Sequence, residues 1–237
     1  MSSSTRVLIA GCFLACAPAF ASIIMVTAPF ASNDSVNWSQ LGADQTAIPQ
    51  SFSATGVPAW AITGGFAGAN GGTVLVTPGS WPATPGSFNS SDSLIWTGDV
   101  LGGSNGPLTL SFPGVIEAGL WIQGDTAPGQ AFTAQVQVFE GGVSSTFTLA
   151  SDSNGDPVFL GGMDSGSAAN ITGLIYSQTA CGGCNVNDFA VDTLFLETAP
   201  VGGGGTPEPS SLLLLGSGLL TLGWKFRRHS LMVRRVL

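Results

Sequence analysis

The sequence predicts an all-β fold, a two-sheet antiparallel sandwich of jelly-roll type. Its 237 residues include 34 Gly and few charged side chains, a composition that disfavours long helices and suits short strands joined by tight turns. About eight to ten short apolar or alternating segments, most of them after residue 72, are separated by turn residues at spacings typical of sandwiches. No repeat with a fixed period is visible, so propellers and solenoids are disfavoured.

The first element is a secretory signal peptide, which we expect to occupy residues 1–21. Arg6 supplies a positive charge, and an apolar stretch follows it directly. Ala19 and Ala21 then form a small-x-small cleavage site before Ser22. This order is typical of a segment that signal peptidase removes, which would leave Ser22 as the first mature residue.

A lipoprotein signal is the alternative for the same segment. Residues 9–12 resemble a lipobox that ends in Cys12. Only Val7 and Leu8 separate this box from Arg6, and so short an apolar stretch is wrong for a signal cleaved there. We therefore expect export without lipidation.

The body, residues 22–201, is expected to be one domain with an extreme charge balance. All six Lys and Arg residues and the one His lie in the terminal segments, and Glu208 is the only one of the fourteen acidic residues outside the body. The body therefore carries thirteen acids, no bases and a formal charge of −13. Such a module repels nucleic acid and anionic membrane surfaces, so cations or neutral polymers are its expected partners.

The strands are predicted from their apolar patterns. Residues 23–72 show only weak candidates, whereas residues 132–138 show the clearest alternation, with apolar side chains on one face and Thr and Gln on the other. Gly141 and Gly142 then indicate a turn, which predicts a hairpin with residues 145–149. The other predicted strands lie at residues 73–77, 94–97, 108–112, 119–123, 158–160, 171–176 and 188–196.

An enzymatic function is not expected. Without Lys, Arg or His, the body cannot form a Ser-His-Asp or Cys-His site, a Schiff base or a phosphate clamp. A carboxylate pair of the glycosidase kind is the remaining route, but no signature singles out two of the acids. A carboxylate-based glycoside hydrolase is therefore the weakest of the function hypotheses.

Two cysteines, Cys181 and Cys184, remain after removal of the signal peptide. In an oxidising exterior, the leading interpretation is a local disulfide that holds a Gly-rich loop. A zinc site would need two more Cys or His ligands, and the mature body has none. A redox role would need a cationic neighbour or a helix N-terminus to lower the thiol pKa, and neither is apparent.

Residues 152–156 form an acidic, Gly-containing segment. Asp152, Asn154 and Asp156 place oxygen atoms at alternate positions, as a calcium loop does. Pro157 stands where an EF-hand needs Gly, so this is not an EF-hand. The favoured interpretation is a polar hairpin turn, with calcium as the alternative and no other cofactor expected.

The tryptophans could offer stacking platforms to sugars. Most of them are expected in the core, because Trp96 and Trp121 lie within apolar strand candidates. Trp81 lies in the loop segment Pro-Gly-Ser-Trp-Pro and is the best candidate for exposure and for contact with a glycan.

The C-terminal element is a linker, a tetrapeptide and an apolar stretch in that order. Residues 202–205 are four glycines, residues 206–209 read Thr-Pro-Glu-Pro, and residues 210–224 carry no charge. As a helix, this last stretch would reach about 22 Å, against about 30 Å for a bilayer core. We expect a short membrane-spanning helix that holds the chain poorly.

This tail resembles the PEP-CTERM sorting domain of exported bacterial proteins, whose pattern is Pro-Glu-Pro, a Leu/Gly-rich helix and a short basic end. The resemblance covers residues 206–229, and the extra basic tail at residues 230–237 is expected to stay in the cytoplasm. It implies that a membrane-embedded exosortase recognises the segment, cleaves near it and passes the body to the cell surface or extracellular matrix. The positions that carry the match are Pro207, Glu208, Pro209, Lys225, Arg227 and Arg228.

The expected function is that of an exported, non-catalytic surface or matrix protein, structural or adhesive in an exopolysaccharide or biofilm context. It would be anchored transiently in the inner membrane and then reach the cell surface. Its expected partners are signal peptidase, an exosortase-type enzyme and extracellular polysaccharide, but no nucleic acid. The second hypothesis is a carbohydrate-binding, lectin-like module, with calcium dependence as one version of it.

Overall fold

The computed structural model describes residues 22–57, 60–77, 81, 88–89, 91–98, 103–126, 130–199 and 217. The chain divides into two compact units, residues 1–199 and residues 200–237. The predicted signal peptide, the Gly linker, the sorting signal and the basic tail lie outside the described residues, as does the predicted membrane-spanning helix except for Ser217. Within the described ranges, no helix is long and apolar enough to cross a membrane.

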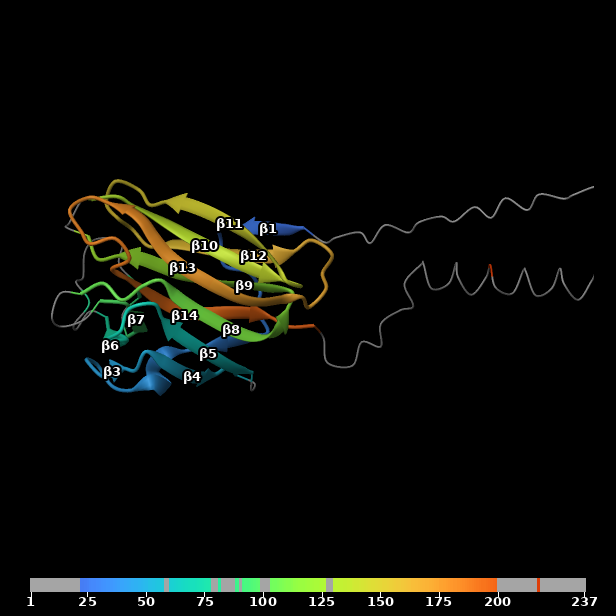
Figure 1. The fold of residues 1–237 in the computed structure, drawn as a ribbon, viewed down its shortest axis with the longest axis horizontal. Helices are drawn as coiled ribbons and strands as arrows, with labels where there is room; N and C mark the ends of the chain where they lie inside the picture. Colours follow the sequence, from blue (N-terminus) through green and yellow to red (C-terminus); the bar gives the residue numbers. More distant parts are fainter. Residues whose placement is uncertain are drawn as a thin grey trace, which may run out of the picture. The chain divides into compact units, whose positions relative to one another are not determined.

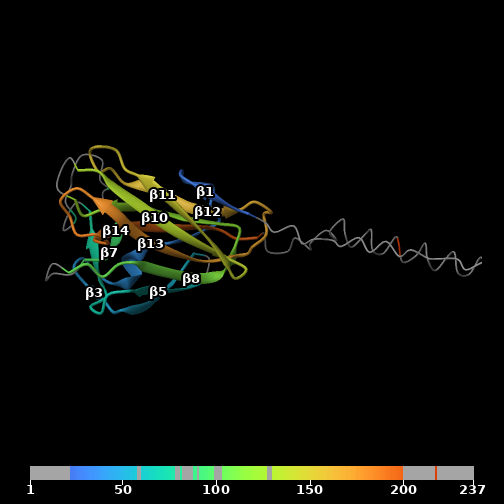
Figure 2. The ribbon, with the colours of Figure 1, turned by 45° about the horizontal axis from the view of Figure 1, so that its top comes forward.

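The first unit consists of two antiparallel β-sheets, and Figures 1 and 2 show their arrangement. Sheet A has eight strands in the order β1-β12-β9-β14-β7-β6-β3, with β2 also paired to β14. Sheet B has six strands in the order β11-β10-β13-β8-β5-β4. The strands are β1 (Ile23–Val26), β2 (Asp34–Val36), β3 (Ala47–Ile48), β4 (Ser51–Thr55), β5 (Ala61–Phe66), β6 (Gly72–Val76), β7 (Ser93–Trp96), β8 (Leu108–Val115), β9 (Glu117–Gly124), β10 (Phe132–Glu140), β11 (Val143–Ala150), β12 (Val158–Asp164), β13 (Ile171–Cys181) and β14 (Phe189–Glu197).

Strands β7 to β14 pair in a nested order, which confirms the predicted sandwich. The hairpin β10–β11 is innermost, and the pairs β9–β12, β8–β13 and β7–β14 surround it in turn. Successive pairs of this set alternate between the two sheets, as in a jelly roll: β10–β11 and β8–β13 belong to sheet B, and β9–β12 and β7–β14 to sheet A. Every strand predicted from residue 73 onward is present, and most of these strands are longer than their apolar patterns indicated.

The hairpin turn between β10 and β11 forms at the predicted glycines. Gly141 and Gly142 have φ angles of 53° and 88°, in the left-handed region that side chains disfavour. Two consecutive residues with positive φ give a turn whose twist matches the twist of the flanking strands. The sequence signal and the backbone therefore agree at this turn.

The segment before residue 73 extends both sheets. Strand β1 adds to the edge of sheet A beside β12, while β4 and β5 continue sheet B beyond β8. A short 3-10 helix, η1 (Trp38–Leu41), follows β2. Its Trp38 is fully buried, and the indole Nε1 donates to the Asp192 carbonyl 2.7 Å away in sheet A.

The main core lies between the two sheets. The alternation predicted for β10 is confirmed, because Phe132, Ala134, Val136 and Val138 are all buried. Facing side chains from β9, β12 and β14 belong to the same cluster. Tyr176 ties the sheets together, because its hydroxyl donates to the Leu160 carbonyl at 2.7 Å.

The outer faces of the two sheets differ. On sheet A, a second apolar cluster covers the outer face and contains Leu75, Leu94 and Ala190 from the strands together with Trp81 and Phe88. On sheet B, the outward side chains of β4, β5 and β11 are exposed to solvent. Sheet B therefore presents the open β-sheet surface of the molecule.

Candidate functional site on the outer face of sheet B

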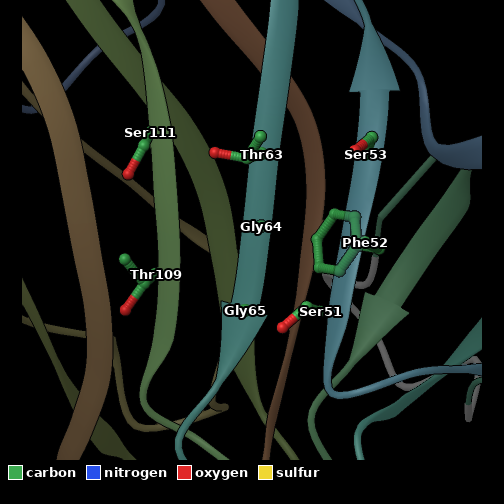
Figure 3. A pocket seen from close by; sticks show the side chains of 8 residues that line it. All are labelled: Ser51, Phe52, Ser53, Thr63, Gly64, Gly65, Thr109 and Ser111. Atoms are coloured by element: carbon green, nitrogen blue, oxygen red, sulfur yellow. The ribbon is translucent and has the colours of Figure 1, made fainter.

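A shallow depression lies on the open face of sheet B, over β4, β5 and β8. Its volume is about 520 Å³. Figure 3 shows hydroxyl-bearing side chains from all three strands around it. We call this depression the hydroxyl trough; its lining residues are Ser51, Phe52, Ser53, Thr63, Gly64, Gly65, Thr109 and Ser111.

Strand register arranges the hydroxyl groups in two rows across the sheet. Ser53, Thr63 and Ser111 are register partners in the first row. In the second row, Gly65 lies between Ser51 and Thr109. The trough is hollow because Gly65 has no side chain where the neighbouring strands carry hydroxyl groups.

The two glycines of β5 have opposite roles. A Cβ atom on Gly64 would lie 2.0 Å from Phe52 Cζ, so the Phe52 ring packs directly against the Gly64 backbone. A Cβ atom on Gly65 would meet only the Gln50 carbonyl oxygen, at 3.5 Å, which is an ordinary contact. Gly64 is thus required by the core beneath the trough, whereas Gly65 keeps the trough open.

The polar surface continues beyond the trough over β13, β10 and β11. Gln135 accepts a hydrogen bond from the Ser177 hydroxyl at 3.3 Å, and Gln137 donates to the Ser144 hydroxyl at 2.9 Å. Glu140 is the only charged residue in the six strands of sheet B, and it is buried. The outer face of these strands is therefore uncharged, although the body as a whole has a charge of −13.

Two pairs of neighbouring carboxylates, Asp192 with Asp92 and Glu117 with Glu197, lie on sheet A or beside it. Burial, followed by the charge of Asp92, raises the pKa of Asp192 on β14 to about 6. Glu117 on β9 is paired in register with Glu197 on β14. Burial and then the Glu197 charge raise the pKa of Glu117. No carboxylate is among the residues that line the hydroxyl trough.

Comparison with known proteins identifies the C-terminal segment. Residues 206–228 match the family model of the PEP-CTERM protein-sorting motif. The chain is a PEP-CTERM domain-containing protein. No curated protein and no solved structure matches the chain, so the family assignment concerns the sorting motif and not the sandwich.

The PEP-CTERM motif contains every tail position predicted to carry sorting. Pro207, Glu208 and Pro209 lie at its beginning, and the basic residues Lys225, Arg227 and Arg228 lie at its end. The motif indicates sorting to the cell surface and processing by an exosortase-type enzyme. These residues lie outside the described part of the structure.

The predicted disulfide is present. Cys181 and Cys184 are bonded at the end of β13, with their Cα atoms 5.8 Å apart. Gln178 Nε2 donates to Cys184 Sγ at 3.3 Å, and the backbone N–H of Gln178 donates to the Asn187 side chain at 3.0 Å. The disulfide therefore holds the loop between β13 and β14.

The acidic segment between β11 and β12 forms a polar turn. Both oxygen atoms of Asp152 accept hydrogen bonds from the segment itself, from the backbone and side chain of Asn154 and from the backbone of Asp156. Bonds from Asp156 and Asn154 lower the pKa of Asp152, while burial and the Asp152 charge raise that of Asp156. Among the described residues, no group of three or more His, Cys, Asp or Glu side chains is placed to hold a metal ion.

The expected exposure of Trp81 is wrong. Its side chain is only 3 % exposed and packs against Phe88, and its indole Nε1 donates to Gln123 Oε1 at 2.9 Å. The ring is buried because the outer face of sheet A is apolar at Leu75 and Leu94, which sequence reasoning assigned to strands but not to a second cluster. Trp81 therefore does not offer its ring to a glycan in this structure.

Sequence reasoning did not find the hydroxyl trough. Its residues are Ser, Thr and Gly, which are too common in this chain to stand out. The available signal was the alternation along β4, where Phe52 and Ala54 lie between Ser and Thr residues. That pattern predicts an exposed hydroxyl row once the strand is recognised.

Proposed function

We propose that this protein is an exported adhesive or structural component of the cell surface or extracellular matrix, and that the outer face of sheet B contacts neutral polysaccharide there. The observation that carries the proposal is an uncharged, hydroxyl-lined trough on a module with thirteen acids and no bases. The PEP-CTERM motif supports the location at the cell surface. The hydroxyl trough supports neutral polysaccharide as the partner.

Charge favours a neutral polymer over an acidic one. The body repels polyanions at long range, and the trough has no Lys, Arg or His side chain to bind a carboxylate or sulfate group. Hydroxyl and amide groups exchange hydrogen bonds with sugar hydroxyls. Half-buried Phe139 and Ile175 on the same sheet face add apolar surface for sugar C–H groups. The volume of the trough lies within the range of about 300–1,000 Å³ typical of ligand sites.

In this proposal, the N-terminal segment directs export and the C-terminal segment directs sorting. Signal peptidase removes residues 1–21, and the short apolar stretch at residues 210–224 then holds the chain in the inner membrane. An exosortase-type enzyme recognises the PEP-CTERM motif and releases the body to the outside. No reaction is assigned to the body itself.

A pair of leucine substitutions on β5 tests the binding surface. Gly65→Leu fills the trough and is expected to weaken binding to neutral polysaccharide by about tenfold, which corresponds to about 1.4 kcal/mol. Ala61→Leu adds a leucine to an exposed position on the same strand, outside the trough lining, and is expected to bind like the unmodified protein. Affinity electrophoresis in gels containing neutral or acidic polysaccharides measures both variants.

The same assay separates the alternatives. Binding to the neutral polymer is expected to be unchanged by added salt, because surface charges do not contribute to it. It is also expected to survive EDTA; loss of binding with EDTA would instead favour the calcium-dependent lectin hypothesis. Equal binding by the Gly65→Leu and Ala61→Leu variants would show that the trough is not the binding surface.

A further inference from the structure

Two carboxylates lie together at one end of the sandwich: Glu140, the last residue of β10, and Asp164, the last residue of β12. Asp164 is fully buried, and Glu140 is only 6 % exposed. Asp164 Oδ1 accepts from the Gly166 backbone at 2.7 Å, and its Oδ2 accepts from Asn170 Nδ2 at 3.0 Å. Glu140 Oε2 is buried and has no hydrogen-bond partner. We call these two side chains the buried acid pair.

The buried acid pair has no basic side chain to balance it. Burial, followed by the charge of Asp164 and a hydrogen bond with it, raises the pKa of Glu140. The nearest charged group on the adjoining strand β9 is Glu117, the register partner of Met163, and it is also an acid. Because the body contains no Lys, Arg or His, no side chain of the body can supply a cation. Two adjacent buried carboxylates without a cation are costly.

Ser22 lies beside Ser165, the residue that follows Asp164. Its backbone nitrogen donates to Ser165 Oγ at 2.9 Å, its Oγ is 3.2 Å from the same atom, and its carbonyl accepts from the Ser165 backbone at 3.1 Å. The next residue, Ile23, is the register partner of Asp164. Three hydrogen bonds thus hold Ser22 against Ser165, and one of them fixes the Ser22 nitrogen next to the residue that follows Asp164.

We propose that the cation of the buried acid pair is the α-ammonium group of Ser22, created when the signal peptide is removed. Hydrolysis of the Ala21–Ser22 peptide bond consumes one water and leaves a carboxylate on Ala21 and an ammonium group on Ser22. The amide nitrogen, which had one hydrogen to donate, becomes a charged group with three. It is the only positive charge in residues 22–205.

This inference rests on the proposed export, and it gives processing a structural consequence. The precursor has a neutral amide at Ser22, whereas the processed chain has a positive charge next to Asp164 and Glu140. The processed form is therefore more stable than the same chain with a blocked N-terminus. Attraction to the acids also raises the pKa of the Ser22 amine above the ordinary range of about 7.7–8.0.

N-terminal acetylation tests the assignment on the processed chain, residues 22–237 in detergent. At pH 6 the free-amine form is expected to melt about 2–4 °C above the acetylated form. A raised amine pKa gives stability that is present below the unfolded value and is lost as pH rises through the folded value. The difference in melting temperature should therefore disappear by about pH 10.

Glu140→Gln is the matched variant, because it keeps the size of the side chain and removes one of the two acids. Acetylation is expected to lower the melting temperature less in this background than in the unmodified chain, since residues that interact do not contribute additively. Equal melting temperatures of the two forms at pH 6 would overturn the proposal. A difference that persists at pH 10, or that is unchanged in Glu140→Gln, would also overturn it.

Two further measurements complete the test. The pKa of the Ser22 amine, followed by NMR, is expected above about 8; a value at or below the ordinary range would contradict the ion pair. Calcium chloride is expected to leave the melting temperature of the free-amine form unchanged at pH 6, and a rise would assign the acids to a metal ion instead. N-terminal sequencing of exported protein tests the cleavage at Ser22 separately, so failure of the export proposal can be distinguished from failure of this one.

Discussion

Replacing Gly64 with alanine is expected to lower the melting temperature of the body by about 10 °C, because overpacking of a core costs about 3 kcal/mol and a domain of this size loses about 2–4 °C per kcal/mol. The new Cβ atom would lie 2.0 Å from Phe52 Cζ. The Phe52 ring has little freedom to move, since its centroid lies 5.6 Å from that of Phe66 and 6.4 Å from that of Trp38.

Gly65→Ala is the matched control on the adjacent residue. The new methyl group points to the outer face and meets only the Gln50 carbonyl oxygen, at 3.5 Å, so the melting temperature is expected to change by less than about 2 °C. Thermal unfolding followed by circular dichroism measures both variants. Similar melting temperatures for the two would mean that Phe52 does not pack against Gly64 as described.

Acidification from pH 8 to pH 4 is expected to stabilise the body. Burial, followed by the nearby Asp92 carboxylate, raises the pKa of Asp192 from its ordinary value of 3.8 to about 6 in the folded protein. The folded state therefore binds a proton more tightly than the unfolded state. The resulting stability is fully present below the pKa of Asp192 in the unfolded chain and is lost as pH rises through its pKa in the folded protein. For this group the free energy of unfolding changes by about 3 kcal/mol.

Other carboxylates reinforce the effect. Burial also raises the pKa values of Asp34, Asp125 and Glu140. The variant Asp192→Asn removes the titration but keeps an oxygen that can accept the hydrogen bonds from Thr193. Its free energy of unfolding is expected to depend less on pH than that of the unmodified protein. Urea unfolding between pH 4 and pH 8 measures this dependence, and identical curves would show that Asp192 does not titrate as described.

Most of the jelly roll could be predicted from the sequence because its strands have one buried and one polar face. Strand β10 is the clearest case, and the glycines after it determine the turn. Strands in the first fifty residues of the body were harder to predict, for a physical reason. Strands such as β4 and β5 are built from Ser, Ala, Thr and Gly, whose weak apolar contrast gives little periodicity.

The candidate site could not be predicted because it depends on strand pairing. The hydroxyl trough requires β5 to pair with both β4 and β8, and the register partners Thr63 and Ser111 are far apart in sequence. The buried position of Trp81 was missed for a related reason. A second apolar layer on sheet A covers it, and alternation within a single strand does not reveal such a layer.

Export and sorting can be tested most directly by an intact mass of the protein recovered from the outside of its native cells. We predict a mass that begins at Ser22 and ends before the apolar stretch at residues 210–224. It should be lighter by two hydrogen atoms because of the bond between Cys181 and Cys184. A mass that includes all residues through Leu237 would contradict processing at the PEP-CTERM motif and would indicate a permanently anchored surface protein.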